Sequence, residues 1–155
     1  MSDFDKYIQR GAYHWAEVDP GNCGYNPPLL ARYQVLANQV PAGRTRALDI
    51  GCGDGYLSYL LCRRGIRYVV GVDADAVGVG LSRQKLQEQG CLAASQLVGS
   101  AYALPFADGS FDTVVMADVI EHLDDPRRCL GEVVRVLGKN GAAIFSTPCK
   151  QPDRV

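Results

Sequence analysis

The chain has 155 residues, 47% hydrophobic and 21% charged, which fits one globular domain and excludes a disordered or fibrous protein. Lys and Arg number 16 and Asp and Glu number 17, so the net charge of −1 gives no overall attraction for nucleic acid or anionic lipid. No apolar run is long enough to span a bilayer, and six cysteines without a CxxC pair, beside two histidines, argue against a zinc finger and indicate reduced thiols in the cytoplasm.

The first 40 residues differ in pattern from the rest of the chain. Residues 1–25 mix aromatic residues with glycines and predict a short helix or an irregular arm. Asn26 followed by Pro27 is typical of a helix start, and apolar residues then recur at helical spacing until Pro41. We therefore expect an N-terminal helical arm or lid over residues 1–40 and the main domain over residues 41–155.

Beyond residue 41, short apolar runs alternate with helical stretches. We expect strands at 46–50, 68–72, 96–99, 113–118 and 142–146, and helices at 56–64, 75–89 and from Pro126, with a turn at 138–141. The helix capped by Asp125 should bury Leu130, Val133, Val134 and Leu137. The strands lack polar alternation, so both of their faces should be buried. The pattern predicts a doubly wound α/β fold with a mostly parallel sheet, whose ligands bind at the carboxyl ends of the strands.

A glycine-rich loop follows the first predicted strand directly. Gly51, Gly53 and Gly55 alternate with Cys52 and Asp54, and a helix begins at once. Glycine permits positive φ and close approach of a ligand, and the helix start offers free N–H groups. The context indicates a nucleotide-type binding loop rather than a plain structural turn. It departs from the dinucleotide pattern, because a tyrosine stands at position 56 where a glycine is expected.

Two acids flank this loop in the predicted sheet. Asp73 ends the second strand, where an acid can accept hydrogen bonds from the hydroxyls of a ribose, although it could also be a surface cap. Asp49 lies between two apolar residues of the first strand and needs hydrogen-bond partners. It could hold the loop or the amino end of a cationic ligand, and the sequence leaves both interpretations open.

Four segments, in this order, resemble the motifs of class I S-adenosylmethionine-dependent methyltransferases. They are residues 47–55 (ALDIGCGDG), 70–73 (VGVD), 103–112 (ALPFADGSFD) and 119–126 (VIEHLDDP, with Val136, Leu137 and Gly141 behind it). The resemblance covers about residues 44–149. It implies a Rossmann-like fold, S-adenosylmethionine as cofactor and S-adenosylhomocysteine as product. The EHL segment and residues 146–148 resemble the branch of quinone-biosynthesis and natural-product methyltransferases, which implies a small-molecule acceptor methylated on O or N.

The resemblance also implies roles for individual residues. The glycines would face the methionine part of the cofactor, Asp73 the ribose, Ala74 or Asp75 the adenine, and Asp118 the methyl group. Ser100 and Ala101 would lie near the adenine amino group, although relatives usually carry an acid in place of this serine. The implied cofactor-binding set is Asp49, Gly51, Cys52, Gly53, Gly55, Asp73, Ala74, Ser100, Ala101 and Asp118.

Candidate catalytic residues cluster after the fourth predicted strand. Methyl transfer is an in-line displacement from an activated donor, so the protein supplies alignment and, where needed, a base. Asp118 and His122 are the catalytic candidates; the histidine could be a general base, or it could order the loop together with Glu121. In the arm, the aromatic stretch that includes His14 could cover the cofactor or pack on the sheet.

Asp118, Glu121 and His122 also resemble the metal-binding set of small-RNA 2′-O-methyltransferases. The first acid of that set is a glutamate rather than an aspartate, no histidine follows residue 122, and the chain lacks a basic surplus. We therefore expect neither a metal site nor a nucleic-acid substrate.

The methyltransferase family sheet has seven strands, in the order 3-2-1-4-5-7-6, whereas this sequence stops just past the fifth. We expect a sheet truncated there, with its edge covered by a second copy of the chain, by a missing C-terminal segment or by the arm. The truncation also leaves open a cofactor-binding module without turnover.

Overall fold

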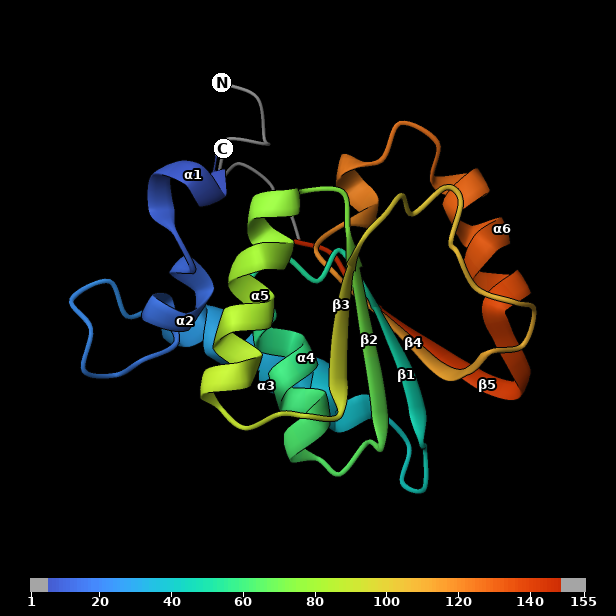
Figure 1. Ribbon diagram of the computed structural model, residues 1–155, viewed down its shortest axis with the longest axis horizontal. Helices are drawn as coiled ribbons and strands as arrows, with labels where there is room; N and C mark the ends of the chain where they lie inside the picture. The colour runs from blue at the N-terminus through green and yellow to red at the C-terminus, as the bar shows by residue number, and fades with distance from the viewer. Residues whose placement is uncertain (1–5, 149–155) are drawn as a thin grey trace, which may run out of the picture.

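A parallel sheet of five strands forms the centre of the computed structural model, which describes residues 6–148 (Figure 1). The strands are β1 (Arg46–Ile50), β2 (Tyr68–Asp73), β3 (Ala94–Val98), β4 (Phe111–Ala117) and β5 (Leu137–Ser146). Their order is β3-β2-β1-β4-β5, and every neighbouring pair is parallel. The chain crosses from β3 past β1 to β4, so the strand order reverses beside β1. The doubly wound α/β fold is therefore confirmed, with its switch point at the carboxyl ends of β1 and β4.

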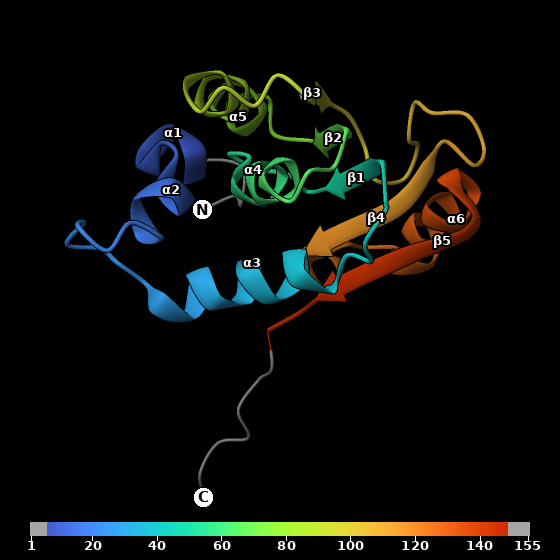
Figure 2. The ribbon, with the colours of Figure 1, turned by 90° about the horizontal axis from the view of Figure 1, so that it is seen from below.

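Helices cover both faces of this sheet (Figure 2). They are α1 (Lys6–Arg10), α2 (Tyr13–Glu17), α3 (Pro27–Gln39), α4 (Tyr56–Arg63), α5 (Ala76–Glu88), the 3₁₀ turn η2 (Ile120–His122) and α6 (Pro126–Val136). α3, α4 and α5 lie on one face, and α6 lies on the other. Asn26 and Asp125 cap α3 and α6 as predicted, because their side chains accept the N–H groups of Leu29 and Arg128.

The core consists of two apolar layers separated by the sheet. Leu48 and Ile50 of β1 pack with α6 residues in one layer, and Ala47 packs with α4 residues such as Leu61 in the other. The four named side chains are each at most 1% exposed. Burial of β1 on both faces explains why its sequence is apolar without alternation.

Two local predictions were wrong around β5 and α6. The segment 138–141 belongs to β5 rather than to a turn, with a register shift against β4 and a left-handed residue at Asn140 (φ 64°). The register against β4 passes from Leu137, opposite Phe111, to Ala142, opposite Thr113, so the four residues form an unpaired irregularity within the strand. Val134 is 74% exposed, because Val133 faces the sheet and the next residue of a helix points about 100° away.

The connection from β3 to β4 contains no helix, and two charged residues of α6 hold it. The Arg135 guanidinium donates to the carbonyl oxygens of Leu104 (2.9 Å) and Phe106 (2.6 Å), and to both carboxylate oxygens of Glu132. Glu132 in turn accepts the N–H of Leu104 at 2.6 Å. Hydrogen bonds from Arg135 and from this N–H lower the pKa of Glu132 to about 2.

Substitution of Glu132 should reveal this network as an acid-dependent loss of stability. The folded carboxyl has a pKa of about 2 against an ordinary 4.5, so its stabilisation is complete above pH 4.5 and disappears as the pH falls toward 2. At neutral pH, Glu132→Gln should lower the melting temperature by roughly 2–4 °C, and the difference from wild type should shrink below pH 4. Thermal unfolding monitored by circular dichroism tests this. The control is Glu88→Gln, on a surface carboxyl whose partners are Lys85 and Gln84; an equal loss there would contradict the assignment.

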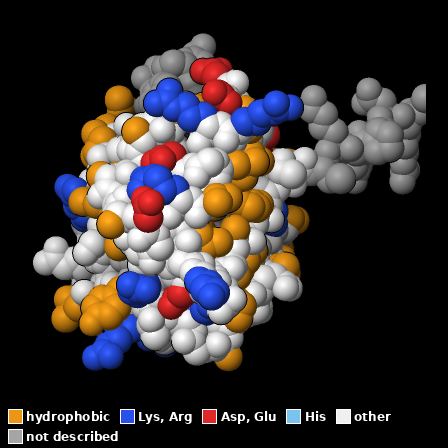
Figure 3. All heavy atoms as spheres, turned by 90° about the vertical axis from the view of Figure 1, so that its right-hand side faces the viewer, with side chains coloured by type: hydrophobic (Ala, Val, Ile, Leu, Met, Phe, Trp, Pro, Cys, Tyr) orange, Lys and Arg blue, Asp and Glu red, His pale blue; other side chains and the backbone are white. Residues whose placement is uncertain are grey.

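β5 forms one edge of the sheet, and no strand among residues 6–148 pairs with its outer side. Apolar side chains form a stripe on the side of the molecule that carries α6 and β5 (Figure 3). Phe145, at the end of β5, is 40% exposed. Coverage of this edge by a second copy or by a further C-terminal segment stays a prediction.

Within the described part of the chain, no helix combines the length and the apolar character needed to cross a bilayer.

Candidate active site

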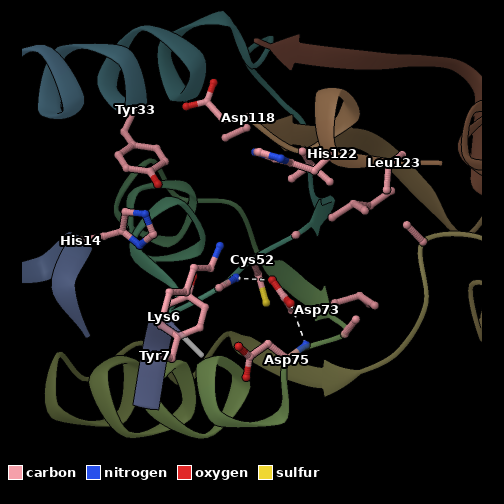
Figure 4. Close-up of a pocket in the computed structure, with 18 of the residues that line it drawn as sticks. Lys6, Tyr7, His14, Tyr33, Cys52, Asp73, Asp75, Asp118, His122 and Leu123 are labelled. Carbon is pink, nitrogen blue, oxygen red and sulfur yellow. Dashed lines mark hydrogen bonds between the residues drawn. The ribbon is translucent and has the colours of Figure 1, made fainter. Parts of the chain in front are cut away.

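A cavity of about 600 Å³ opens at the carboxyl ends of β1, β2 and β4, and the N-terminal helices form one of its walls (Figure 4). Most of the site residues expected from the sequence line it: Gly51, Cys52, Gly53, Asp73, Ala74, Ser100, Ala101, Asp118 and His122. Asp49 and Gly55 are not among the lining residues. The cavity also has walls that the sequence did not assign to the site: Lys6, Glu17, Leu29, Arg32, Tyr33 and Tyr102.

The three loop glycines leave space for other parts of the protein as well as for a ligand. All three have positive φ, at 74°, 51° and 87°. A Cβ atom at Gly51, Gly53 or Gly55 would come within 2.2 Å of Val119, 2.0 Å of Tyr7 or 2.1 Å of Ser82, respectively. The first two glycines keep their backbone in the cavity wall. Gly55 instead packs against α5, so the expectation that it faces a cofactor is not supported by its position.

Asp73 ties the glycine loop to the end of β2. One of its carboxylate oxygens accepts the N–H of Gly53 at 2.8 Å, and the other accepts the N–H of Asp75 at 2.9 Å (Figure 4). A carboxylate oxygen can accept more than one hydrogen bond, so this acid can still receive a ligand hydroxyl from the cavity. The two contacts hold the side chain at the place where the sequence predicts a ribose.

Asp49 lies in the core behind the loop. It is 1% exposed and accepts a hydrogen bond of 2.7 Å from the Ser58 hydroxyl at the start of α4. Burial raises the pKa of this carboxyl to about 7. Of the two interpretations left open by the sequence, its position favours holding the loop against α4 and does not support contact with a ligand amine.

Asp118 has an unusual backbone and two side-chain partners. Its φ is 53°, in the left-handed region that residues other than glycine rarely adopt. One carboxylate oxygen forms an ion pair with Arg32 of α3 at 3.0 Å, and the other accepts the hydroxyl of Ser146 at 3.0 Å. Contacts from two other elements therefore hold a strained residue at the rim of the cavity.

His122 has no comparable support. Its side chain is 63% exposed, and its Nε2 atom lies 4.0 Å from Glu121, too far for a hydrogen bond. The cluster expected from the sequence thus comes together in space, but only Asp118 in it is firmly oriented.

A second histidine, in the arm, is firmly oriented. His14 of α2 lines the cavity, and its backbone N–H and ring Nδ1 lie 2.9 Å from the two carboxylate oxygens of Asp54. Trp15 donates its indole N–H to the backbone carbonyl of the same aspartate at 2.7 Å. Sequence reasoning treated Asp54 only as a loop member; an acid inside a glycine loop, 40 residues from a histidine, was the available signal.

Tyrosine rings surround His14 and stay neutral. Ring centroids of Tyr13 and Tyr33 lie 4.0 and 5.8 Å from the imidazole. Tyr7 lies between Gly53 of the loop and Gly78 of α5, where a Cβ on either glycine would collide with it. Burial, and then the charge of Asp54, raises the pKa of Tyr13 to about 12 and the pKa of Tyr7 and Tyr33 above their usual range.

Small side chains line the part of the cavity beyond Asp73. Ala74 follows the acid directly, and Ala101 follows Ser100 after β3. The Ser100 hydroxyl already accepts the N–H of Tyr102 at 3.1 Å. Burial raises the pKa of the Cys52 thiol well above its usual range, so this cysteine is a neutral wall residue rather than a nucleophile.

Within residues 6–148, no three His, Cys, Asp or Glu side chains come together in a group that could hold a metal ion.

Comparisons with known proteins agree with this geometry. Residues 48–145 match the family described as "Methyltransferase domain". An "Uncharacterized methyltransferase" of Mycobacterium sp. (strain JLS) is 37% identical over 115 residues, which are 74% of this chain and 42% of that protein. A "Ubiquinone biosynthesis O-methyltransferase" of Psychrobacter arcticus is 30% identical over 149 residues, which are 90% of this chain and 52% of that protein.

A solved structure of a SAM-dependent methyltransferase from Thermotoga maritima superimposes with a TM-score of 0.60 at 30% identity, covering 75% of this chain and 49% of that one. The chain spans about half the length of the curated relatives it matches. The family match covers most of the sheet and the loop that carries the cavity. The chain therefore belongs to the methyltransferase-domain family, and it has the Rossmann-like fold of class I S-adenosylmethionine-dependent methyltransferases.

Proposed function

We propose that the chain binds S-adenosylmethionine in this cavity and transfers its methyl group to an oxygen or nitrogen atom of a small molecule. The observation that carries the proposal is the coupling of Asp73 to the backbone N–H of Gly53. This hydrogen bond fixes the distance between Asp73, the proposed ribose-binding acid, and the glycine loop that precedes α4. Relatives and a solved structure that are named methyltransferases support the same conclusion.

The residues present fit the cofactor part by part. A cavity of about 600 Å³ lies within the range of ligand sites. Asp73 would hold the ribose diol, and the small residues Ala74, Ser100 and Ala101 would leave room for a flat adenine. The exposed backbone of Gly51 and Gly53 would receive the methionine part. When bound, the cofactor supplies a methyl group already activated on a sulfonium.

Several features support a small acceptor rather than a polymer. The arm closes one side of the cavity through Tyr7, His14 and Tyr33, in the manner of a lid. A chain of net charge −1 lacks the basic surplus that nucleic acid requires. The Psychrobacter relative is named for ubiquinone biosynthesis and O-methylation, which points to the same class of acceptor.

Asp73→Asn should weaken cofactor binding without unfolding the chain. The amide keeps the shape of the side chain, but it loses the charge that strengthens hydrogen bonds from the ribose hydroxyls, and its NH2 group cannot accept one of the two backbone N–H groups that the carboxylate accepts. A charged hydrogen bond contributes about 1.5–3 kcal/mol, so the Kd for S-adenosylmethionine should rise roughly 10- to 100-fold. Isothermal titration calorimetry with S-adenosylmethionine and S-adenosylhomocysteine measures this. The matched control is Asp124→Asn, an exposed acid on the wall of the same cavity, which should bind like wild type.

A second candidate is a cofactor-binding module without turnover. One observation favours it: Asp118 is paired with Arg32, and His122 lacks an orienting contact, so neither expected catalytic residue is poised as a base. Calorimetry and a methyl-transfer assay separate the candidates. Binding with transfer to a small acceptor supports the enzyme, binding without transfer supports the module, and absence of binding contradicts both.

A further inference from the structure

His14 and Asp54 form a pair that the expected chemistry of the site does not use. The imidazole lines the cavity, while Asp54, at 1% exposure, lies behind it in the loop. The side chain of His14 itself is 16% exposed. A histidine backed by a buried carboxylate and open to a ligand cavity is the arrangement of an oriented proton acceptor.

The hydrogen bonds of this pair determine which ring nitrogen faces the cavity as an acceptor. One oxygen of Asp54 accepts the His14 backbone N–H, and the other lies 2.9 Å from Nδ1. An ionised carboxylate only accepts hydrogen bonds, so Nδ1 carries the ring proton and Nε2 carries the lone pair. Among residues 6–148, no polar atom forms a hydrogen bond with Nε2, and contacts with Tyr13 and Tyr33 hold the ring in place.

The other candidate bases are less suited to take a proton. Both carboxylate oxygens of Asp118 are already engaged, one by Arg32 at 3.0 Å and the other by the Ser146 hydroxyl at 3.0 Å. The imidazole of His122 is 63% exposed and 4.0 Å from its nearest ionic neighbour, so nothing sets its orientation. Of the three, His14 alone combines a defined tautomer, a packed ring and access to the cavity.

Resting on the proposed function, we propose that His14 is the general base of the reaction, that Asp54 is its positioning residue, and that the acceptor atom is a hydroxyl oxygen. A hydroxyl oxygen becomes a good nucleophile as it loses its proton, which is the step a base assists.

The step needs no reactant other than the acceptor, the cofactor and His14. The hydroxyl proton of the acceptor moves to His14 Nε2. The acceptor oxygen forms a bond to the methyl carbon as the bond from that carbon to sulfur breaks, and its electron pair returns to sulfur. The products are a methyl ether, S-adenosylhomocysteine and a protonated imidazole, which releases its proton to solvent.

Several of the other groups that face His14 are already paired, because Glu17 forms an ion pair with Arg10, and Arg32 forms one with Asp118. The facing groups come from all the elements packed around it: Lys6 and Tyr7 of α1, Tyr13 and Glu17 of α2, Arg32 and Tyr33 of α3, and Asp54 of the loop. Raised pKa values keep the three tyrosines protonated at neutral pH. The Asp54 carboxylate, 2.9 Å from Nδ1, keeps the imidazole in one orientation.

The first test needs no acceptor. Long-range ¹H–¹⁵N correlation spectra of the complex with S-adenosylhomocysteine, assigned with His14→Asn, report the tautomer of the ring. We expect Nδ1 protonated and Nε2 bare at pH 8, and a change at Nε2 when catechol is added. A proton on Nε2 at that pH, or no response to catechol, would overturn the proposal.

The second test compares two substitutions of the same residue. The amide nitrogen of His14→Asn can replace Nδ1 at Asp54 and keep the arm in place, whereas His14→Gln approximates the position of Nε2 and loses that contact. With phenol, catechol and 3,4-dihydroxybenzoate as acceptors, His14→Asn should lower kcat roughly 100-fold or more with little change in KM. It should also remove the loss of kcat that wild type shows on acidification. Asp54→Asn, whose amide can accept only one of the two His14 N–H groups, should also lower kcat and alter the pH profile.

The outcomes separate this inference from the proposed function. Failure of wild type to bind S-adenosylmethionine in calorimetry contradicts the proposed function itself. Binding with turnover that survives in His14→Asn contradicts only the base, and shows that the pair merely anchors the arm. Binding without methylation of any of the three compounds contradicts the hydroxyl acceptor and, with it, the role of His14 as a base.

Discussion

Gly55→Ala should strongly destabilise the protein and abolish cofactor binding, although Gly55 does not line the cavity. Its φ of 87° is strained for alanine, and the new Cβ would lie 2.1 Å from the Ser82 hydroxyl and 3.2 Å from the Cα of the same residue. The left-handed conformation costs about 1–2 kcal/mol and overpacking about 1–3 kcal/mol more. A loss of roughly 2–5 kcal/mol is a large share of the stability of an ordinary domain. Because α5 must move away from the loop, the free energy of unfolding and the affinity for S-adenosylmethionine should fall together.

Gly65→Ala is the matched control for this substitution. Gly65 has nearly the same φ, 83°, but no atom lies within 4 Å of the position of its Cβ. It should therefore lose only the backbone contribution, about 1–2 kcal/mol, and bind the cofactor like wild type. Urea unfolding of both variants measures the difference. Equal losses would show that conformation alone, and not contact with α5, requires glycine at position 55.

Asp49→Asn should make the protein more stable at pH 8 than wild type. The carboxyl has a pKa of about 7 in the fold against 3.8 in the unfolded chain, because burial disfavours its charge. Between these values the folded state keeps a proton that the unfolded state has lost, so the stability of wild type falls as the pH rises from about 4 to 7. At 1.36 kcal/mol for each pKa unit, the loss amounts to roughly 2–4 kcal/mol, and the amide avoids it.

Denaturant unfolding between pH 4 and pH 8 tests whether the stability of wild type falls as the pH rises. The curves of wild type and Asp49→Asn should nearly coincide at pH 4 and separate as the pH rises. Asp124→Asn, on an exposed acid, should follow wild type throughout. A variant that kept the pH slope of wild type but lost affinity for S-adenosylmethionine would restore the interpretation that Asp49 holds the ligand amine.

Several features were predictable because their signals are local. Strand β1 is buried on both faces, and its apolar residues Ala47, Leu48 and Ile50 fall on both faces without alternation. The helix starts at Asn26 and Asp125 depend on a side chain and an N–H three residues away. The glycine loop and Asp73 could likewise be placed at the cavity, because the carboxyl ends of neighbouring parallel strands must meet.

Contacts between distant elements could not be predicted in this way. The sequence contains Asp54 and His14, but nothing local brings the N-terminal helix over the loop so that the two meet. The ion pair of Arg32 with Asp118 likewise depends on how α3 crosses β4. The sequence pattern thus favoured His122 as the histidine of the site, whereas packing oriented His14.

The sequence by itself determined the fold class, the binding loop and the family, because burial, capping and glycine conformation act on neighbouring residues. Only the tertiary structure showed that Gly55 packs against α5 and that Asp49 is hydrogen-bonded to Ser58 in the core. The same is true of His14, which the N-terminal arm brings to Asp54 in a fixed orientation. The physical reason is that those roles depend on the angles and distances at which separate elements pack, and a pattern within one element does not contain them.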